Sequence, residues 1–235
     1  MRNRDIFLAT LALLVAWEIA ALILNRDILP APTDVLVALV VQVPRGLGWH
    51  FVVSAWRVVA SIALSVALAT PAGLVLGQYP RVNRFFAPLI YLTYPIPKIV
   101  LLPIVISFLG IGDASKIAII FLILFFQVLV VVRDQASALR PELLYSVRSL
   151  GAGRRALLRF VYLPATLPAV LTAIRVSIGT AIAVLFFTES FGTNAGLGYY
   201  IIVDTFQRIA FPEMYAGVVA MSVLGLALYF IVDFL

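Results

Sequence analysis

The sequence predicts an all-α integral membrane protein with about six transmembrane helices, and three observations lead to this fold class. Of the 235 residues, 63% are hydrophobic and 12% are charged, whereas soluble domains are nearer half apolar and a quarter charged. The apolar residues gather in six runs of about 20 residues, the length that a helix needs to cross a bilayer. Outside these runs no stretch is long enough for a soluble domain, so we expect one transmembrane domain over residues 1–235.

The expected spans occupy residues 6–24, 53–77, 86–109, 114–132, 168–188 and 214–234. The charged start before the first run also fits a signal peptide. That run is long enough to span, however, and no small-x-small cleavage site follows it, so we favour an uncleaved first helix. The last run reaches Leu235 with no basic tail, which predicts that the natural chain continues a little further.

Residues 30–44 lie between the first two spans and are too short to cross a bilayer. Thr33 or Asp34 is a residue type that caps helix N-termini, so we expect a helix over residues 35–43. Because this helix cannot span, we expect it to lie at the membrane interface.

The basic residues predict the orientation, because cytoplasmic loops of membrane proteins carry an excess of lysine and arginine. With the N-terminus inside, the cytoplasmic segments hold Arg2, Arg4, Arg81, Arg84, Arg133, Arg140, Arg148, Arg154, Arg155 and Arg159. The outer segments hold only Arg26, Arg45, Lys116 and Arg208. This bias predicts a multi-pass protein whose N-terminus and whose loop at residues 133–167 are cytoplasmic. It also explains the pI near 9.9 without a nucleic acid partner.

Several chemistries are excluded by residue counts. The chain has no cysteine and a single histidine, His50, so it has no thiol chemistry, histidine metal cluster or catalytic triad. No phosphate-binding motif occurs; the glycines of residues 192–198 have the wrong spacing and fit a re-entrant or turning segment. We therefore expect no enzyme, metal site or cofactor in this chain. A membrane-embedded enzyme and an ion-coupled secondary transporter remain as alternatives, although the latter is usually longer, with paired intramembrane acids.

The arginine-rich loop predicts a helix–turn–helix, with helices over residues 141–150 and 154–162. Gly151 and Gly153 allow a sharp turn between them. Pro164 and Pro168 are expected to stop or redirect the second helix. The first helix has an apolar stripe that should meet a protein partner, made by Leu143, Leu144, Val147 and Leu150.

This loop also carries a spacing motif. Gly151 precedes Val161-Tyr162-Leu163-Pro164 as G-x9-[apolar]-x-L-P. The pattern resembles the E-A-A-x3-G-x9-I-x-L-P coupling loop, or EAA loop, of ABC importer permeases. The E-A-A triplet falls on Tyr145-Ser146-Val147, so the family's acid is absent, and Glu142, one turn earlier, is the candidate to replace it. The resemblance implies that the ATPase is contacted by Glu142, Tyr145, Ser146, Val147, Arg148, Ser149, Leu150, Gly151, Ala152, Leu163 and Pro164.

Further stretches resemble the nitrate/sulfonate/taurine-type permeases of this family. They are Leu29-Pro30-Ala31-Pro32, Pro95-Ile96-Pro97 with residues 102–116, residues 172–179, and Glu189 with Gly196-Leu197-Gly198-Tyr199. The resemblance implies a type I, binding-protein-dependent importer in the lipid of a bacterial or archaeal inner membrane. A homodimer of this chain would form the pathway. Two ATP-binding cassette subunits would bind ATP and Mg, and an extracytoplasmic binding protein would deliver the solute.

Polar residues within the spans are candidates for the pathway, because a charge in lipid is costly. Lys98 follows the helix-breaking sequence Tyr94-Pro95-Ile96-Pro97, where it would favour an anion or, equally, snorkel or pair structurally. Arg175 and Glu189 are 14 residues apart and share a helical face. The predicted pathway residues are Tyr94, Lys98, Arg175, Ser177, Thr180, Thr188 and Glu189. The solute would be small, namely nitrate, a sulfonate, a taurine-like molecule or a carboxylate.

Two other charges within the runs are expected to be structural. Glu18 lies deep in the first span, and we expect it to pair with a neighbouring helix. Arg57 lies near the outer start of the second span, and we expect its long side chain to snorkel to the interface.

Overall fold

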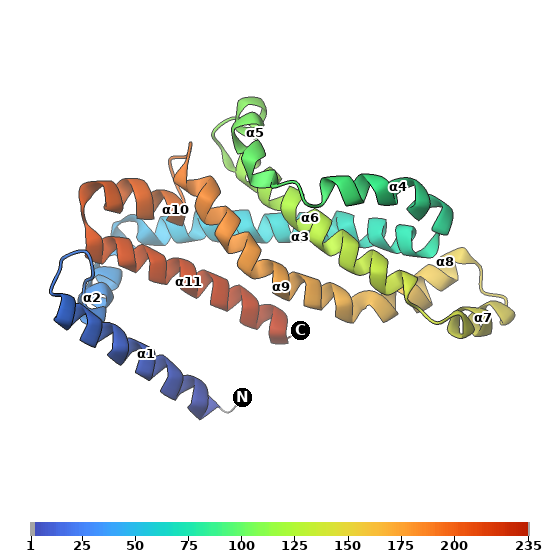
Figure 1. Ribbon diagram of the computed structural model, residues 1–235, viewed down its shortest axis with the longest axis horizontal. Helices are drawn as coiled ribbons and strands as arrows, with labels where there is room; N and C mark the ends of the chain where they lie inside the picture. Colours follow the sequence, from blue (N-terminus) through green and yellow to red (C-terminus); the bar gives the residue numbers. More distant parts are fainter. Residues whose placement is uncertain (1–2, 235) are drawn as a thin grey trace. The chain divides into compact units, whose positions relative to one another are not determined.

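The computed structural model describes residues 3–234, and all regular structure within this range is helical (Figure 1). The α-helices are α1 (Asn3–Leu24), α2 (Pro32–Gln42), α3 (Gly48–Gln78), α4 (Pro80–Thr93), α5 (Leu102–Leu109), α6 (Asp113–Ser137), α7 (Pro141–Ser149), α8 (Arg154–Leu157), α9 (Leu163–Ser190), α10 (Leu197–Tyr199) and α11 (Phe211–Phe234). Arg2, which contributes to the predicted orientation, lies outside the described residues. The expectation of an all-α membrane protein is confirmed.

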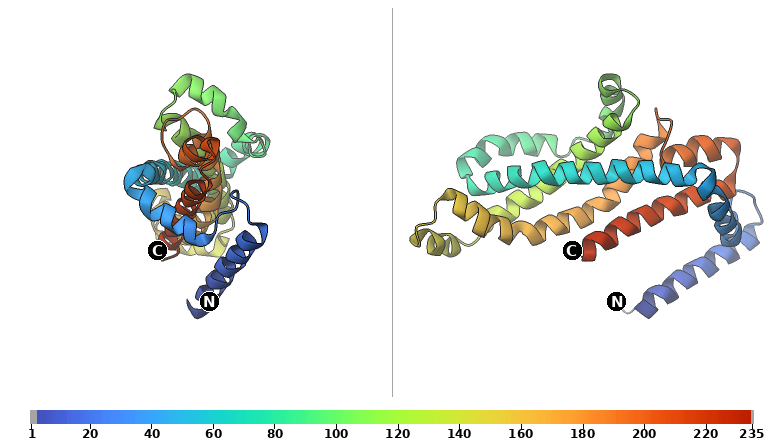
Figure 2. Two further views of the ribbon diagram at one scale, coloured as in Figure 1. Left: turned by 90° about the vertical axis from the view of Figure 1, so that its left-hand side faces the viewer. Right: turned by 180° about the vertical axis from the view of Figure 1, so that it is seen from behind.

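Five helical stretches of residues 3–234 are long and apolar enough to cross a membrane. They are Phe7–Leu24, Pro32–Gln78, Asp113–Ser137, Arg154–Ser190 and Phe211–Phe234. A sixth consists of α4 together with Lys98–Leu109, and it bends by 79° between its two parts. Figure 2 shows this bend from two further sides. The range 86–109 was expected to be one span that contains a helix-breaking sequence, and the helix does end after Thr93, because Pro95 and Pro97 cannot donate backbone hydrogen bonds.

The predicted N-cap of α2 is wrong. The capping position belongs to Ala31, which makes no side-chain capping bond, and Pro32 is the first helical residue. Proline favours this position because its ring fixes φ and its missing N–H would be unpaired there in any case. Thr33 and Asp34 therefore fall in the first turn, where the negative Asp34 carboxylate interacts favourably with the positive end of the helix dipole.

The expectation that Pro164 and Pro168 would stop the second helix of the loop is also wrong. Residues Leu158–Tyr162 form a π-helical turn that leads directly into α9, and Pro168 lies inside that helix. Proline is tolerated in membrane helices where π turns and hydroxyl groups pair the freed carbonyls. Arg154–Ser190 is therefore one continuous helical stretch, which joins the second helix of the loop to the following span.

The chain forms two compact units, and the divisions between them fall within α3, α9 and α11. Unit 1 contains Met1–Ala55 and Glu189–Leu224, and unit 2 contains Trp56–Thr188 and Gly225–Leu235. Each unit is described by itself below.

The core of unit 2 is built on close packing of α3 against α6. A Cβ atom on Gly73 would lie 2.9 Å from the Cβ of Val132, and one on Gly77 would overlap the Cβ of Ala136. Small residues of this kind let membrane helices approach closely, where packing replaces the hydrophobic effect. The surrounding buried residues are Ala69, Leu74, Leu76, Ile90, Val128, Leu129, Leu157, Val161, Tyr162, Val170 and Ala173. Residues of the loop at 133–167 and of α9 thus share one apolar core with α3 and α6.

Candidate solute pathway and coupling loop

The break after α4 places a lysine ammonium against free backbone carbonyls. Lys98 is only 8% exposed and begins a short 3₁₀ turn, Lys98–Leu101. Its Nζ donates to the carbonyls of Thr93 at 2.9 Å, Tyr94 at 3.0 Å and Ile96 at 3.3 Å. The last carbonyls of a helix lack intrahelical partners, and a lysine can satisfy them. Lys98 therefore caps the end of α4 rather than snorkelling.

The same ammonium lies beside a small pocket of unit 2. Nζ is 4.6 Å from the ring centroid of Phe126 and 6.0 Å from that of Tyr94, within the range of cation–π attraction. The pocket has a volume of about 260 Å³. Its walls are formed by Tyr94, Ile96, Pro97, Lys98, Ile99, Ile123, Phe126, Gln127 and Val184. A cation and aromatic rings thus line one pocket beside the helix break.

Gln127 connects this pocket to α9, and sequence reasoning missed it. The buried Ser177 hydroxyl donates to its Oε1 at 3.1 Å. Of the predicted pathway residues, Tyr94 and Lys98 therefore line the pocket and Ser177 holds one of its walls. An amide alone in the apolar run 114–132 is costly in lipid, and that signal could have identified Gln127.

Arg175 is held elsewhere, by an acid on the last helix. Its Nη2 lies 2.8 Å from Oδ1 of Asp233, and its guanidinium lies 6.0 Å from the Tyr229 ring centroid. Arg175 does not line the Lys98 pocket. Arg175 therefore forms an ion pair that connects α9 to α11.

Thr180 and Thr188 also lie away from the Lys98 pocket. Thr180 is half-buried, and the buried Thr188 hydroxyl donates to the Leu185 carbonyl of its own helix at 2.9 Å. The predicted pathway residues of α9 therefore do not meet at one site in unit 2.

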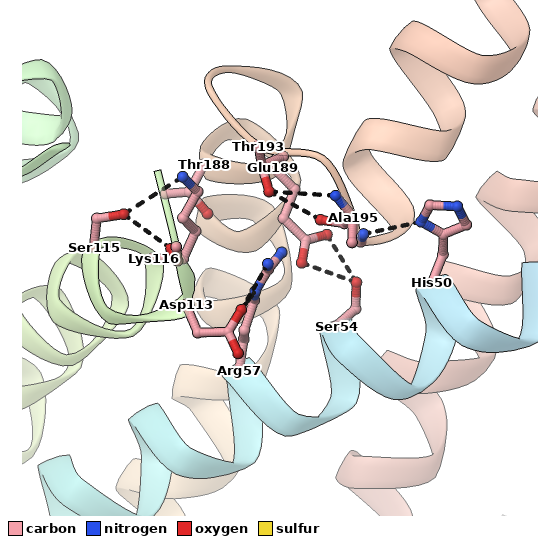
Figure 3. Close-up of polar contacts among 12 residues, drawn as sticks. His50, Ser54, Arg57, Asp113, Ser115, Lys116, Thr188, Glu189, Thr193 and Ala195 are labelled. Carbon is pink, nitrogen blue, oxygen red and sulfur yellow. Dashed lines mark hydrogen bonds and ion pairs between the residues drawn. The ribbon is translucent and has the colours of Figure 1, made fainter. Parts of the chain in front are cut away.

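Glu189 is fully buried in unit 1, where it ties the end of α9 to the following turn (Figure 3). Its two carboxylate oxygens lie 3.0 and 2.8 Å from the Ser54 hydroxyl, and one accepts the Gly198 N–H at 3.0 Å. The Ser54 oxygen in turn accepts the Leu197 N–H at 2.7 Å. Gly196 has φ of 119°, and a side chain there would overlap the Glu189 carboxylate. This geometry gives Glu189 the role of an anchor for residues 196–198.

Three other charges differ from expectation. Arg57 was expected to snorkel, but it is 3% exposed and its Nη2 and Nε lie 2.8 and 2.9 Å from Oδ1 of Asp113 (Figure 3). A guanidinium fork paired with a carboxylate is favoured over an unpaired charge at this depth. Lys116, assigned to an outer loop, is fully buried in the first turn of α6. Glu18 is half-buried, and within residues 3–234 it makes no ion pair.

The loop at residues 133–167 forms the expected helix–turn–helix. Helix α7 ends at Ser149, Gly151 turns the chain with φ of 84°, and α8 begins at Arg154. The apolar stripe, however, does not face a single way. Leu144 and Val147 are partly buried against the core of unit 2, whereas Leu150 is 86% exposed. The stripe was expected to meet a partner as a whole, but half of it attaches α7 to its own unit.

The exposed surface of α7 and its turn is mostly polar, with a few large apolar side chains. Glu142 is exposed in the first turn and makes no side-chain ion pair within the described chain. The Ser146 hydroxyl donates to the Glu142 carbonyl at 2.8 Å, and the Ser149 hydroxyl to the Ser146 carbonyl at 2.8 Å. The predicted coupling residues that are exposed are Glu142, Tyr145, Ser146, Arg148, Ser149, Leu150, Gly151, Leu163 and Pro164.

Comparison with known proteins identifies the family to which the chain belongs. Residues 69–235 match the model of the binding-protein-dependent transport system inner membrane component. The chain is 29% identical to the taurine transport system permease protein TauC of Escherichia coli (strain K12), over 97% of this chain and 86% of that protein. It is 28% identical to the formylaminopyrimidine transport permease protein ThiX of Halalkalibacterium halodurans, over 92% and 86%.

A third relative is a protein of Bacillus subtilis (strain 168) named for aliphatic sulfonates transport, SsuC. It is 26% identical over 86% of this chain and 74% of its own length. These relatives favour an importer over the two alternatives, a membrane enzyme and an ion-coupled transporter. The chain belongs to the inner membrane components of binding-protein-dependent transport systems, as a multi-pass ABC importer permease of the taurine and sulfonate type.

Proposed function

We propose that this permease passes a small anionic solute from an extracytoplasmic binding protein to the cytoplasm, driven by ATP hydrolysis in partner subunits. The observation that carries the solute class is Lys98, a cation on the wall of a pocket of about 260 Å³ at a helix break. A fixed positive charge in a low-dielectric cleft raises the local concentration of anions. Nitrate, a sulfonate, a taurine-like solute and a carboxylate all meet this requirement.

The pocket also supplies groups that orient a solute. The Gln127 amide lies on its wall, with its oxygen engaged by Ser177, so its NH₂ group is available as a donor. The Lys98 ammonium has three donor hydrogens, and three backbone carbonyls now accept from it. An anion that reaches the pocket would exchange with one of these carbonyls, so binding would be coupled to the geometry of the break.

Energy coupling is assigned to the loop at residues 133–167. Two copies of the chain would form a homodimer with the pathway between them, and two ATP-binding cassette subunits would contact α7. The exposed Leu150 and Glu142 present an apolar and an acidic contact on this helix. Because Leu144 and Val147 attach α7 to the core of unit 2, a displacement of α7 would be transmitted to α3, α6 and α9. The chain itself would act without a cofactor.

The test is uptake by the complete importer in proteoliposomes, with Lys98→Gln, Lys98→Arg and, as a charge-matched control, Arg26→Gln. We expect Lys98→Gln to lower uptake of an anionic solute about tenfold, the effect of about 1.4 kcal/mol. Lys98→Arg should retain most uptake because it keeps the charge, and Arg26→Gln should behave as the unchanged protein. Size-exclusion chromatography checks assembly. Full uptake by an assembled Lys98→Gln importer would show that Lys98 is only a helix cap.

A further inference from the structure

Unit 1 contains a second polar pocket that has no role in the function proposed above. It has a volume of about 350 Å³ and lies between the end of α2, the start of α3, the segment at residues 200–210 and the first turn of α11. Its walls are formed by Gln42, Arg45, Gly46, His50, Tyr200, Asp204, Thr205, Arg208, Ala210 and Glu213. Four of these residues carry a formal charge, two of each sign.

Three polar groups on these walls have no partner within residues 3–234. Tyr200 is 6% exposed, and its hydroxyl is buried without a hydrogen bond. The Arg45 guanidinium and the Glu213 carboxylate form no ion pair or hydrogen bond in the described chain. A buried hydroxyl without a partner is destabilising, and the residue that carries it lines this pocket, which points to a ligand or ordered water nearby.

One side of the pocket suits an ammonium group. Burial, with the nearby carboxylates of Glu213 and Asp204, raises the pKa of Tyr200 to about 12, so the phenol stays neutral at physiological pH. The negative field that disfavours phenolate favours a cation in the same place. Two carboxylates and a phenol oxygen are acceptors for the three hydrogens of an ammonium group.

His50 completes this side without adding a charge. Its Nδ1 accepts the Gly196 N–H at 3.0 Å, so its ring proton is on Nε2, which lies 3.4 Å from Oδ2 of Asp204. This arrangement describes a neutral imidazole that orients the Asp204 carboxylate. Its ring also lies 5.5 Å from that of Tyr200, which holds the phenol in place.

The two arginines of the pocket wall, Arg45 and Arg208, suit an anionic group of the ligand. Arg45 lies at the kink between α2 and α3, where Gly46 has φ of 134°. Arg208 is 72% exposed, and its contact with Asp204 is long at 3.7 Å, so its charge is weakly engaged. The formal charges of Arg45, Arg208, Asp204 and Glu213 cancel, so neither a simple cation nor a simple anion matches the whole pocket.

We propose that this pocket binds a small zwitterion, with its ammonium group towards Asp204, Glu213 and Tyr200 and its acidic group towards Arg45 and Arg208. A pocket of about 350 Å³ lies within the range of small-molecule sites. The site is separate from the Lys98 pocket and shares no residue with it. Its role as a receiving site on the outer face rests on the proposed orientation, whereas the binding itself does not.

The experiment measures calorimetric binding of three probes of similar size to the permease with its ATPase subunits in nanodiscs, without ATP. Taurine carries both charges, ethanesulfonate only the negative one and ethylamine only the positive one. We expect taurine to bind at least about tenfold more tightly than either single-charge probe, because each of those probes loses one set of charge-assisted contacts. Equal affinity for taurine and ethanesulfonate would overturn the proposal.

Variants locate the site. Glu213→Gln and Arg45→Gln should each weaken taurine binding about tenfold, whereas Asp27→Asn and Arg26→Gln, which remove the same charges outside this pocket, should not. Tyr200→Phe removes one oxygen without a charge and should weaken binding several-fold, so the proposal stays testable if a charge variant fails to fold.

Two results would contradict the site. Unchanged taurine affinity in folded Glu213→Gln and Tyr200→Phe proteins would exclude the pocket as its location. Loss of binding-protein association in Arg45→Gln, with no taurine binding to the unchanged complex, would show that the pocket receives side chains of that protein instead. Because no step requires transport or hydrolysis, this proposal and the proposed function can fail separately.

Discussion

The Ser54 hydroxyl lies 2.8 and 3.0 Å from the two carboxylate oxygens of Glu189, 135 positions further along the chain. This contact holds the end of α9 against α3 within unit 1, and the Gly198 N–H also donates to the carboxylate at 3.0 Å. A fully buried carboxylate is stable only when such donors replace its water. Glu189 therefore has structural partners in this fold, and its predicted place in the pathway stays a prediction.

Replacing Glu189 by Ala should destabilise the protein by about 2–4 kcal/mol, because the Ser54 hydroxyl and the Gly198 N–H would both lose their buried acceptor. Thermal unfolding of purified protein in detergent measures the change. Glu142→Ala is the matched control, since Glu142 is exposed. Equal midpoints for the two variants would mean that the Glu189 network contributes nothing to stability.

Substitutions at two glycines with similar backbone conformations distinguish the cost of backbone strain from the cost of steric overlap. Gly196 and Gly110 both have positive φ, 119° and 79°, but only Gly196 has the Glu189 carboxylate where a Cβ would lie. Gly110→Ala should cost about 1–3 kcal/mol through backbone strain alone. Gly196→Ala should cost clearly more, since the carboxylate must also move. The same unfolding assay compares them, and a smaller loss for Gly196→Ala would refute the tight turn.

The packing of α3 on α6 predicts opposite signs for two helical glycines. Gly77→Ala should destabilise unit 2 by about 1–3 kcal/mol, because the new methyl group overlaps that of Ala136. Gly179→Ala should stabilise α9 by about 0.5–1 kcal/mol, since its Cβ would have nothing within 4 Å. Shifts of the same sign in thermal unfolding would argue against the close approach of the two helices.

The coupling assignment is tested by association with the ATPase subunits. Glu142→Gln should weaken co-purification about tenfold if this acid replaces the missing one of the E-A-A triplet. Asp134→Asn is the control, because Asp134 is an exposed acid of the same loop that is already paired with Arg133 at 2.7 Å. Unchanged ATPase binding in Glu142→Gln, with uptake intact, would assign the contact to another residue.

A second variant pair examines the turn of the same loop. Gly151 has φ of 84°, which favours glycine, whereas Gly153 has an ordinary φ of −75°. Neither would bring a Cβ within 4 Å of another residue. We therefore expect Gly151→Leu to uncouple ATP hydrolysis from uptake and Gly153→Leu to be tolerated. If Gly151→Leu retains coupled uptake, the turn does not position α7 for the ATPase.

Local features were predictable wherever the physical cause lies in neighbouring residues. The break at residues 94–97 follows from two prolines, and the turn at Gly151 from a residue type that tolerates positive φ. The N-cap of α2 and the continuity of α9 through Pro168 were missed because proline has two roles. It starts helices as well as ending them, and a π turn can accommodate it.

The fold class and the number of spans were determined by the sequence itself, whereas the coupling role of residues 133–167 stays a prediction from the sequence. Hydropathy and span length act locally, because a bilayer imposes the same thickness on every apolar helix. Only the tertiary structure decided which acid pairs with Arg57 or Arg175, which donors surround Glu189, and that Gln127 joins Lys98 at one pocket. Apart from Gly198, which is 9 positions from Glu189, these partners are 29 to 135 positions apart, and the close packing of helices brings them together.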